Sequence, residues 1–223
     1  MTNPEVFHPT NLIEGPWQIL LKHAFKLIDS MKAHSGVADP FWTLGGGTVL
    51  MFRYRHRRSK DIDVFVPDPQ FLGYVNPRLS DVAAEVSQDY VETAGYIKLI
   101  RAEGEIDFVA SRNLTQNPYE WWQLEGRDVR VETAAEIVAK KLWHRGYAAT
   151  ARDLFDLSLV IDQDPDSLRT AATYLARHRD SFIKQLHERE SILKIQFEAI
   201  DALEYRPAFE LARQVSENFL ISL

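Results

Sequence analysis

The 223-residue sequence contains no cysteine. This absence excludes a disulfide framework, thiolate zinc sites and cysteine nucleophiles. The seven histidines form no His-x-x-x-His or similar spacing, so the sequence gives no histidine zinc site either. The chain also lacks a G-x-x-x-x-G-K-[ST] segment, which excludes a Walker-type phosphate loop.

Long apolar runs and an excess of positive charge are also missing. No apolar run reaches the roughly 18 residues of a membrane span, and residues 1–16 do not resemble a signal peptide. These absences favour a cytoplasmic protein without a membrane partner. The formal net charge is −6, whereas proteins that bind nucleic acid non-specifically are usually basic. Any contact with nucleic acid must therefore depend on a local basic patch.

The composition is that of an ordinary globular protein, with 45% hydrophobic and 26% charged residues. Apolar periodicity predicts helices over 16–33, 48–54 and 79–90. Alternating β-formers predict strands over 41–44, 61–66, 95–101, 105–110 and 129–131, and residues 113–120 are rich in turn formers.

The pattern changes at Thr133, after which the chain is helical to its end with breaks near Gly146, 162–166 and 206–207. Thr133 and Glu136 have the spacing of a capping box. The sequence therefore predicts an α+β fold in two parts. Residues 1–132 form a mixed sheet with flanking helices, and residues 133–223 form a helical lobe that closes a cleft.

Three aspartates point to metal-dependent chemistry. Asp61 and Asp63 project from the same face of a predicted strand, because side chains alternate along it. Two adjacent carboxylates repel each other unless a cation neutralises them, and Mg²⁺ prefers such oxygen ligands together with substrate phosphates. Asp107 lies in a later apolar strand that can reach the same face. We expect these three to be the catalytic metal ligands of a two-metal site.

The glycine-rich turn before the aspartate strand predicts a phosphate site. Without β-carbons, Gly46 and Gly47 let backbone N–H groups approach a triphosphate closely. The hydroxyl of Thr48 can donate to a phosphate oxygen. A helix that starts at this turn adds a favourable dipole for the anion.

Cations on the predicted helix after Thr133 fit the same ligand. Lys141 and Arg145 share one helix face, and this like-charged pair becomes favourable beside a triphosphate. We expect Lys141 to bind phosphate oxygens as part of the catalytic set, and Arg145 or Arg152 to stabilise the departing pyrophosphate. Asp153 is expected to orient these cations by ion pairs and is also a candidate for a direct role in nucleotide binding. A solvated basic face is the alternative, and Lys140 could replace Lys141 as the phosphate ligand.

A basic run over 53–60 directly precedes the aspartate strand. Its last members, Arg58 and Ser59, are the closest in sequence to the carboxylates. They are candidates for binding phosphates of the nucleotide or of an RNA acceptor. A solubilising loop is the alternative interpretation.

Taken together, these segments resemble the polymerase-β nucleotidyltransferase superfamily, and more narrowly the AbiEii toxins of type IV toxin–antitoxin systems. The resemblance covers about residues 40–160. It rests on Gly46–Leu50 followed by His56–Asp63, on Glu105–Phe108 as the strand of the third carboxylate, and on 136–146 with 152–157, which resemble the helical K-L-x-x-x-R and R-D-h-h-D-h motifs.

The resemblance implies a polymerase-β-type core that transfers a nucleoside monophosphate from an NTP to an acceptor hydroxyl and releases pyrophosphate. It implies Mg²⁺, with Mn²⁺ as an alternative, and members of the family modify tRNA or act beside a cognate antitoxin. Three interpretations of the acceptor stay open at this point: RNA, a small molecule such as an antibiotic, or no acceptor at all in a nucleotide-binding or interaction module. The three carboxylates argue against the last.

Overall fold

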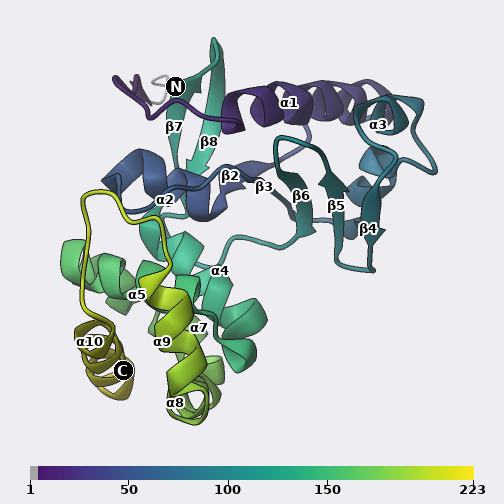
Figure 1. Ribbon diagram of the computed structural model, residues 1–223. Helices are drawn as coiled ribbons and strands as arrows, with labels where there is room; N and C mark the ends of the chain where they lie inside the picture. Colours follow the sequence, from purple (N-terminus) through teal and green to yellow (C-terminus); the bar gives the residue numbers. More distant parts are fainter. Residues whose placement is uncertain (1–4) are drawn as a thin grey trace. The chain divides into compact units, whose positions relative to one another are not determined.

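A computed structural model describes residues 5–223 (Figure 1). Residues 1–4, which begin both the expected first lobe and the stretch compared with a signal peptide, lie outside the described residues. The chain forms two compact units. The sheet unit comprises the chain up to Phe52, Ser59–Asn113 and Tyr119–Glu132, and the helical unit comprises Arg53–Arg58, Leu114–Pro118 and Thr133–Leu223.

The sheet unit is built on one eight-stranded mixed sheet with the order β1-β7-β8-β2-β3-β6-β5-β4. Its strands are β1 (Val6–Phe7), β2 (Thr43–Gly45), β3 (Ile62–Val66), β4 (Tyr90–Glu92), β5 (Tyr96–Ile100), β6 (Glu105–Ala110), β7 (Tyr119–Leu124) and β8 (Arg127–Glu132). In the centre, β3 pairs antiparallel with β2 and parallel with β6, which in turn pairs antiparallel with β5. The mixed sheet expected from the sequence is confirmed.

The helical segments that accompany this sheet are α1 (Trp17–His34), α2 (Gly46–Tyr54), α3 (Asp81–Val86) and the 3₁₀ segment η1 (Pro69–Val75). Helix α1 matches the prediction over 16–33, because its buried side chains recur every three to four residues. It packs on β3, β6 and η1, and it runs alongside α3 (Figure 1). Helix α2 starts two residues earlier than expected, within the glycine run.

One expectation for this unit is wrong, and one strand was not predicted. The helix predicted over 79–90 ends at Val86, because the backbone turns extended at Ser87, whose hydroxyl donates to carbonyl oxygens of Asp89 and Ile100. The turn-rich segment 113–120 runs into strand β7 at Tyr119, which the sequence pattern did not predict. A tight turn with positive φ at both Glu125 and Gly126 pairs β7 with β8 as a hairpin.

The helical unit contains α4 (Ala134–Arg145), α5 (Ala151–Gln163), α6 (Pro165–Thr170), α7 (Ala172–Leu175), α8 (Arg179–Glu188), α9 (Glu190–Glu198) and α10 (Phe209–Ile221), with short 3₁₀ turns η2 (Gly146–Ala148) and η3 (Ala176–His178). Helix α5 packs against α4, α9 and α10. The predicted breaks at Gly146 and 206–207 lie between α-helices, whereas the break predicted over 162–166 is reduced to Asp164, between α5 and α6. None of the helices in residues 5–223 combines the length and apolar character that a membrane span requires.

The start of α4 shows how the helical unit holds a distant segment. Thr133 accepts a hydrogen bond from the Glu136 N–H, which is half of the predicted capping box. The Glu136 carboxylate does not complete the box. It accepts instead from the backbone N–H groups of Leu114 and Thr115 and from the Thr115 hydroxyl. A fully buried glutamate therefore fixes the 114–118 segment.

Candidate active site

One row of residues crosses the centre of the sheet. Strand register places Gly45 opposite Asp63, Asp63 opposite Asp107, and Asp107 opposite Lys98. Cross-strand neighbours in register point to the same face. Asp63 and Asp107, which are 44 positions apart in the sequence, are therefore direct neighbours on parallel strands, as the sequence predicted for two of its three carboxylates.

Gly46 makes room for one of these carboxylates. Its φ of +75° lies in the left-handed region, and a β-carbon at this position would be 1.8 Å from Oδ2 of Asp63. Gly46, Gly47 and Thr48 form the first turn of α2. The carboxylate of Asp63 thus lies against the turn that the sequence identified as a phosphate site.

Asp107 is in an unusual electrostatic environment. Burial, together with the negative charge of Asp63, raises the pKa of Asp107 to about 7, although Lys98 acts in the opposite direction. Within the described part of the chain, Oδ1 of Asp107 is buried without a hydrogen-bond partner. A buried carboxylate oxygen with no donor, beside a second carboxylate, is chemically suited to a cation.

Lys98 supplies the positive charge at this end of the row. Its ammonium lies 3.4 Å from Oδ2 of Asp107 and contacts the carboxylate of Glu105. Burial alone lowers the pKa of Lys98, but the hydrogen bond to Glu105 and the charge of Asp107 outweigh it, so the pKa is raised. Lys98 stays protonated and neutralises part of the cluster.

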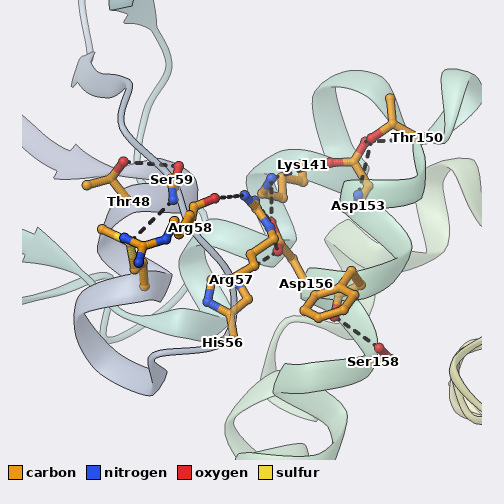
Figure 2. A network of polar contacts seen from close by, with 12 residues as sticks. Thr48, His56, Arg57, Arg58, Ser59, Lys141, Thr150, Asp153, Asp156 and Ser158 are labelled. Atoms are coloured by element: carbon orange, nitrogen blue, oxygen red, sulfur yellow. Dashed lines mark hydrogen bonds and ion pairs between the residues drawn. The ribbon is translucent and has the colours of Figure 1, made fainter. Parts of the chain in front are cut away.

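The carboxylate of Asp61 points elsewhere. Its Oδ1 accepts a 2.9 Å hydrogen bond from the backbone N–H of Glu105. The Thr48 hydroxyl donates to the backbone oxygen of Asp61 at 2.6 Å and also contacts Ser59 Oγ at 3.1 Å (Figure 2). Thr48 and Ser59 therefore tie the start of α2 to the start of β3. Over residues 5–223, no group of three or more His, Asp or Glu side chains is already arranged as a metal site.

The helical unit contains a second polar cluster around Asp156. This fully buried carboxylate accepts hydrogen bonds from His56 Nε2 at 2.9 Å and from Arg57 Nε and Nη2 at 2.8 Å, and Lys141 Nζ lies 3.0 Å away (Figure 2). Burial on its own raises the pKa of Asp156, but Arg57 and Lys141 hold it well below its usual range. Burial also lowers the pKa of His56, so that histidine is neutral at pH 7 and donates from Nε2.

Asp153 connects this cluster to the predicted phosphate-binding cations. Its Oδ1 pairs with Arg145 at 2.6 Å and with Lys141 at 3.3 Å, and its Oδ2 accepts from the Thr150 hydroxyl. Asp153 also completes a capping box with Thr150 at the start of α5. The ion-pair role predicted for Asp153 is thus present.

The remaining predicted cations differ in their surroundings. Arg152 is exposed. Arg58 is also exposed and forms an ion pair with Asp201 at 3.3 Å. Lys140 is buried and pairs with Glu136 on its own helix at 3.3 Å, whereas Lys141 faces α5. The two lysines therefore have separate partners.

The residues of the sheet row fit a divalent metal ion. Mg²⁺ is commonly held by one or two carboxylates, with water and substrate phosphates as its other ligands. Asp63 and Asp107 are adjacent, and Oδ1 of Asp107 has no donor within the described residues. Oδ1 of Asp61, which the sequence placed with them, is already bonded to the N–H of Glu105.

Comparison with known proteins now identifies the class. A family model described as "Nucleotidyl transferase AbiEii toxin, Type IV TA system" matches residues 30–216. The protein is a nucleotidyltransferase. The chain belongs to the AbiEii family, and membership in a type IV toxin–antitoxin family implies a nucleotide substrate and an antitoxin partner. Nucleotidyltransferases generally use divalent metal ions. No curated protein matches the chain.

Two solved structures are similar to the chain. The chain is similar to MenT4, the nucleotidyltransferase toxin Rv2826c from Mycobacterium tuberculosis H37Rv, with 17% identity, a TM-score of 0.50, and coverage of 93% of this chain and 85% of that chain. A putative nucleotidyltransferase from H. pylori has 18% identity, a TM-score of 0.49, and coverage of 91% and 93%. The likeness to MenT4 supports the α+β nucleotidyltransferase fold expected from the sequence.

Sequence reasoning missed two parts of these clusters. Lys98 was not singled out. The sequence predicted its strand, 95–101, directly before the Asp107 strand, 105–110, and the pairing register of these two strands sets Lys98 opposite Asp107. His56 and Arg57 were assigned to a basic loop. Their partner Asp156 lies about 100 positions away, and no local signal distinguishes a buried arginine from an exposed one in such a run.

Proposed function

We propose that this nucleotidyltransferase transfers a nucleoside monophosphate from an NTP to a hydroxyl group of RNA, with tRNA as the most suitable class, and releases pyrophosphate. The observation that carries the proposal is the pair Asp63–Asp107 on adjacent parallel strands, directly beside the first turn of α2. Carboxylates at the start of a glycine-led helix are suited to a metal-bound triphosphate.

In this proposal Asp63 and Asp107 hold Mg²⁺, with Mn²⁺ as a substitute, and Asp61 completes the metal and catalytic set. When bound, the ion supplies positive charge that neutralises the phosphates and favours deprotonation of the attacking hydroxyl.

The other proposed roles concern phosphate binding. Backbone N–H groups of Gly46 and Gly47 face the anion at the start of α2, where Thr48 and Ser59 fix the geometry. Lys141 and Arg145 are proposed to bind phosphate oxygens, and Asp153 holds both cations in place. Arg152 and Arg58 are exposed and are proposed to contact the nucleotide or the RNA backbone.

Family membership supports an antitoxin as the partner that restrains this activity in the cell. RNA is favoured over a small acceptor because Arg58, Arg145 and Arg152 are at least half exposed or lie at the surface, and cations of this kind bind phosphate backbones. The negative net charge confines such contacts to this local set.

The test is a transfer assay with each of the four α-labelled NTPs, Mg²⁺, and either total RNA or a small-metabolite extract as the acceptor. The wild type should label RNA, and D63N should be slower by about 100-fold or more while keeping its thermal stability, because one lost electrostatic contact in the transition state has that effect. Label that enters only small molecules would replace the RNA proposal. Equal rates for D63N and wild type would refute the carboxylate–metal mechanism.

A further inference from the structure

Lys98 lies in the same cross-strand row as the two carboxylates proposed to bind the metal. It is opposite Asp107 on the antiparallel neighbour β5, and its ammonium is 3.4 Å from Oδ2 of Asp107. Asp107 is in turn opposite Asp63. The chain therefore places a permanent cation beside one oxygen of Asp107, while the other oxygen, Oδ1, is buried without a hydrogen-bond partner in the described residues.

Glu105 is a second partner of this ammonium. Glu105 and Asp107 are two positions apart on β6, so their side chains share a face, and Lys98 contacts both carboxylates. The Lys98 side chain is 28% exposed and that of Asp107 is 19% exposed, so solvent screens this charge only partly. Asp63, Glu105 and Asp107 supply three carboxyl groups, and Lys98 supplies the one positive charge among these four side chains.

We infer that Lys98 is an internal counter-ion of the Asp63–Asp107 pair, that a divalent metal binds there in competition with its ammonium, and that Lys98 thereby keeps the metal affinity of the nucleotide-free enzyme low. The inference rests on the proposed metal site and adds a determinant of its affinity. It concerns a positioning residue, since Lys98 acts through Asp107.

Two physical effects of Lys98 on the metal oppose each other. Holding Oδ2 of Asp107 orients the carboxylate, which strengthens metal binding, as partners of ligating groups commonly do. A positive charge next to the same carboxylate repels a divalent ion and weakens binding. Repulsion should dominate, because Asp107 is already fixed by its place in the central strand, whereas the charge of Lys98 is poorly screened.

The functional consequence is that metal binds together with the nucleotide and not before it. A site with a built-in counter-ion binds free metal weakly and fills when the nucleotide brings its own phosphate oxygens as further ligands. Removing Lys98 should therefore tighten the binding of metal alone much more than the binding of metal in the presence of nucleotide.

The test measures Mn²⁺ binding to the full chain without nucleotide. Electron paramagnetic resonance detects the free ion, and its signal gives the amount that is bound. K98M should tighten binding by about 10-fold or more, and K98R, which keeps the charge, should stay within about 2-fold of wild type. E105Q should weaken binding by about 3-fold or more, because it releases Lys98 to pair fully with Asp107. D107N added to K98M should abolish the gain.

The outcomes separate this inference from the proposed function. Unchanged or weaker Mn²⁺ binding by K98M, in a protein whose wild type loses binding on D107N, would overturn the counter-ion role and leave the metal site intact. Binding by neither wild type nor K98M, or binding unaffected by D107N, would overturn both. If K98M does not fold, as judged by circular dichroism, E105Q decides alone: binding as tight as wild type contradicts the inference.

Discussion

Gly46 and Asp63 lie so close that Oδ2 of Asp63 would be 1.8 Å from a β-carbon at position 46. Any other residue at this position must displace the carboxylate, and it must also adopt a φ of +75°. The position of the Asp63 carboxylate, a proposed metal ligand, therefore depends on the absence of a side chain at Gly46, the first residue of α2.

We expect G46A to lower nucleotidyl transfer by about 100-fold, because a displacement of about 1 Å at a reacting centre has an effect of that size. G126A is the matched control. Gly126 has a φ of +76°, but a β-carbon there meets nothing within 4 Å. Both variants should lose stability from backbone strain, measured as Tm, with a further loss in G46A from the clash with Asp63, and only G46A should lose activity. Similar activity in the two variants would show that the contact with Asp63 is unimportant.

The raised pKa of Asp107 predicts a pH-dependent stability of the metal-free protein. Its folded value of about 7 lies above the usual 3.8, so the folded state binds more protons than the unfolded state between these values. The free energy of unfolding therefore falls as pH rises from about 4 to about 7. Above pH 7 the destabilisation by the charged Asp107 carboxylate is complete and stays constant. D107N removes this cost, so in EDTA its Tm should exceed that of wild type most at pH 8, and the gap should shrink as pH falls toward 5.

Asp63 provides the control for this experiment. The charge of Asp63 is one cause of the raised pKa of Asp107, so D63N should shift the pH dependence to lower values. A Tm difference between D107N and wild type that is the same from pH 5 to pH 8 would contradict the assignment.

The Asp156 cluster predicts a large loss of stability when its carboxylate is neutralised. D156N removes the charge of the carboxylate that binds Arg57, which is 3% exposed. Loss of one member of a buried ion pair costs about 3–5 kcal/mol, which urea unfolding can measure. D201N is the control, since the Arg58–Asp201 pair is exposed and should contribute only about 0–1 kcal/mol. Equal losses in both variants would mean that burial does not strengthen the Asp156 cluster.

Lys140 and Lys141 allow a paired test of the phosphate-binding role. Each contacts a buried carboxylate, Lys140 that of Glu136 and Lys141 those of Asp153 and Asp156. K140M and K141M should therefore both lower the free energy of unfolding by a few kcal/mol, roughly as for other broken buried pairs. Only K141M should weaken NTP binding, by about 10-fold or more in calorimetry with Mg²⁺. Equal NTP affinity in the two variants would reject the role of Lys141.

The sequence was sufficient where local patterns determine geometry. The apolar spacing of residues 16–33 predicted α1, because a helix buries every third or fourth side chain. The sequence placed Asp107 in a later apolar strand that could reach the face of Asp63, and the parallel register of β3 and β6 makes the two direct neighbours. The glycines indicated a tight approach, although the partner of Gly46 could not be identified from the chain.

Tertiary contacts determine the features that local sequence patterns could not predict. The predicted 79–90 helix is shortened by hydrogen bonds of Ser87 to a neighbouring strand. Glu136 has the spacing of a capping residue but binds Leu114 and Thr115 instead. His56 and Asp156 are 100 positions apart, and their pairing depends on two segments whose local patterns contain no sign of each other.

The division into two units has a consequence for how this protein can be dissected. The chain passes from one unit to the other at Phe52/Arg53, Arg58/Ser59, Asn113/Leu114, Pro118/Tyr119 and Glu132/Thr133. A fragment cut at the last of these junctions would keep Asp156 with Lys141 and Glu136 with Lys140. It would lose the other partners of these carboxylates, namely His56, Arg57, Leu114 and Thr115. The helical unit is therefore not a module that can be fused, transplanted or inherited on its own.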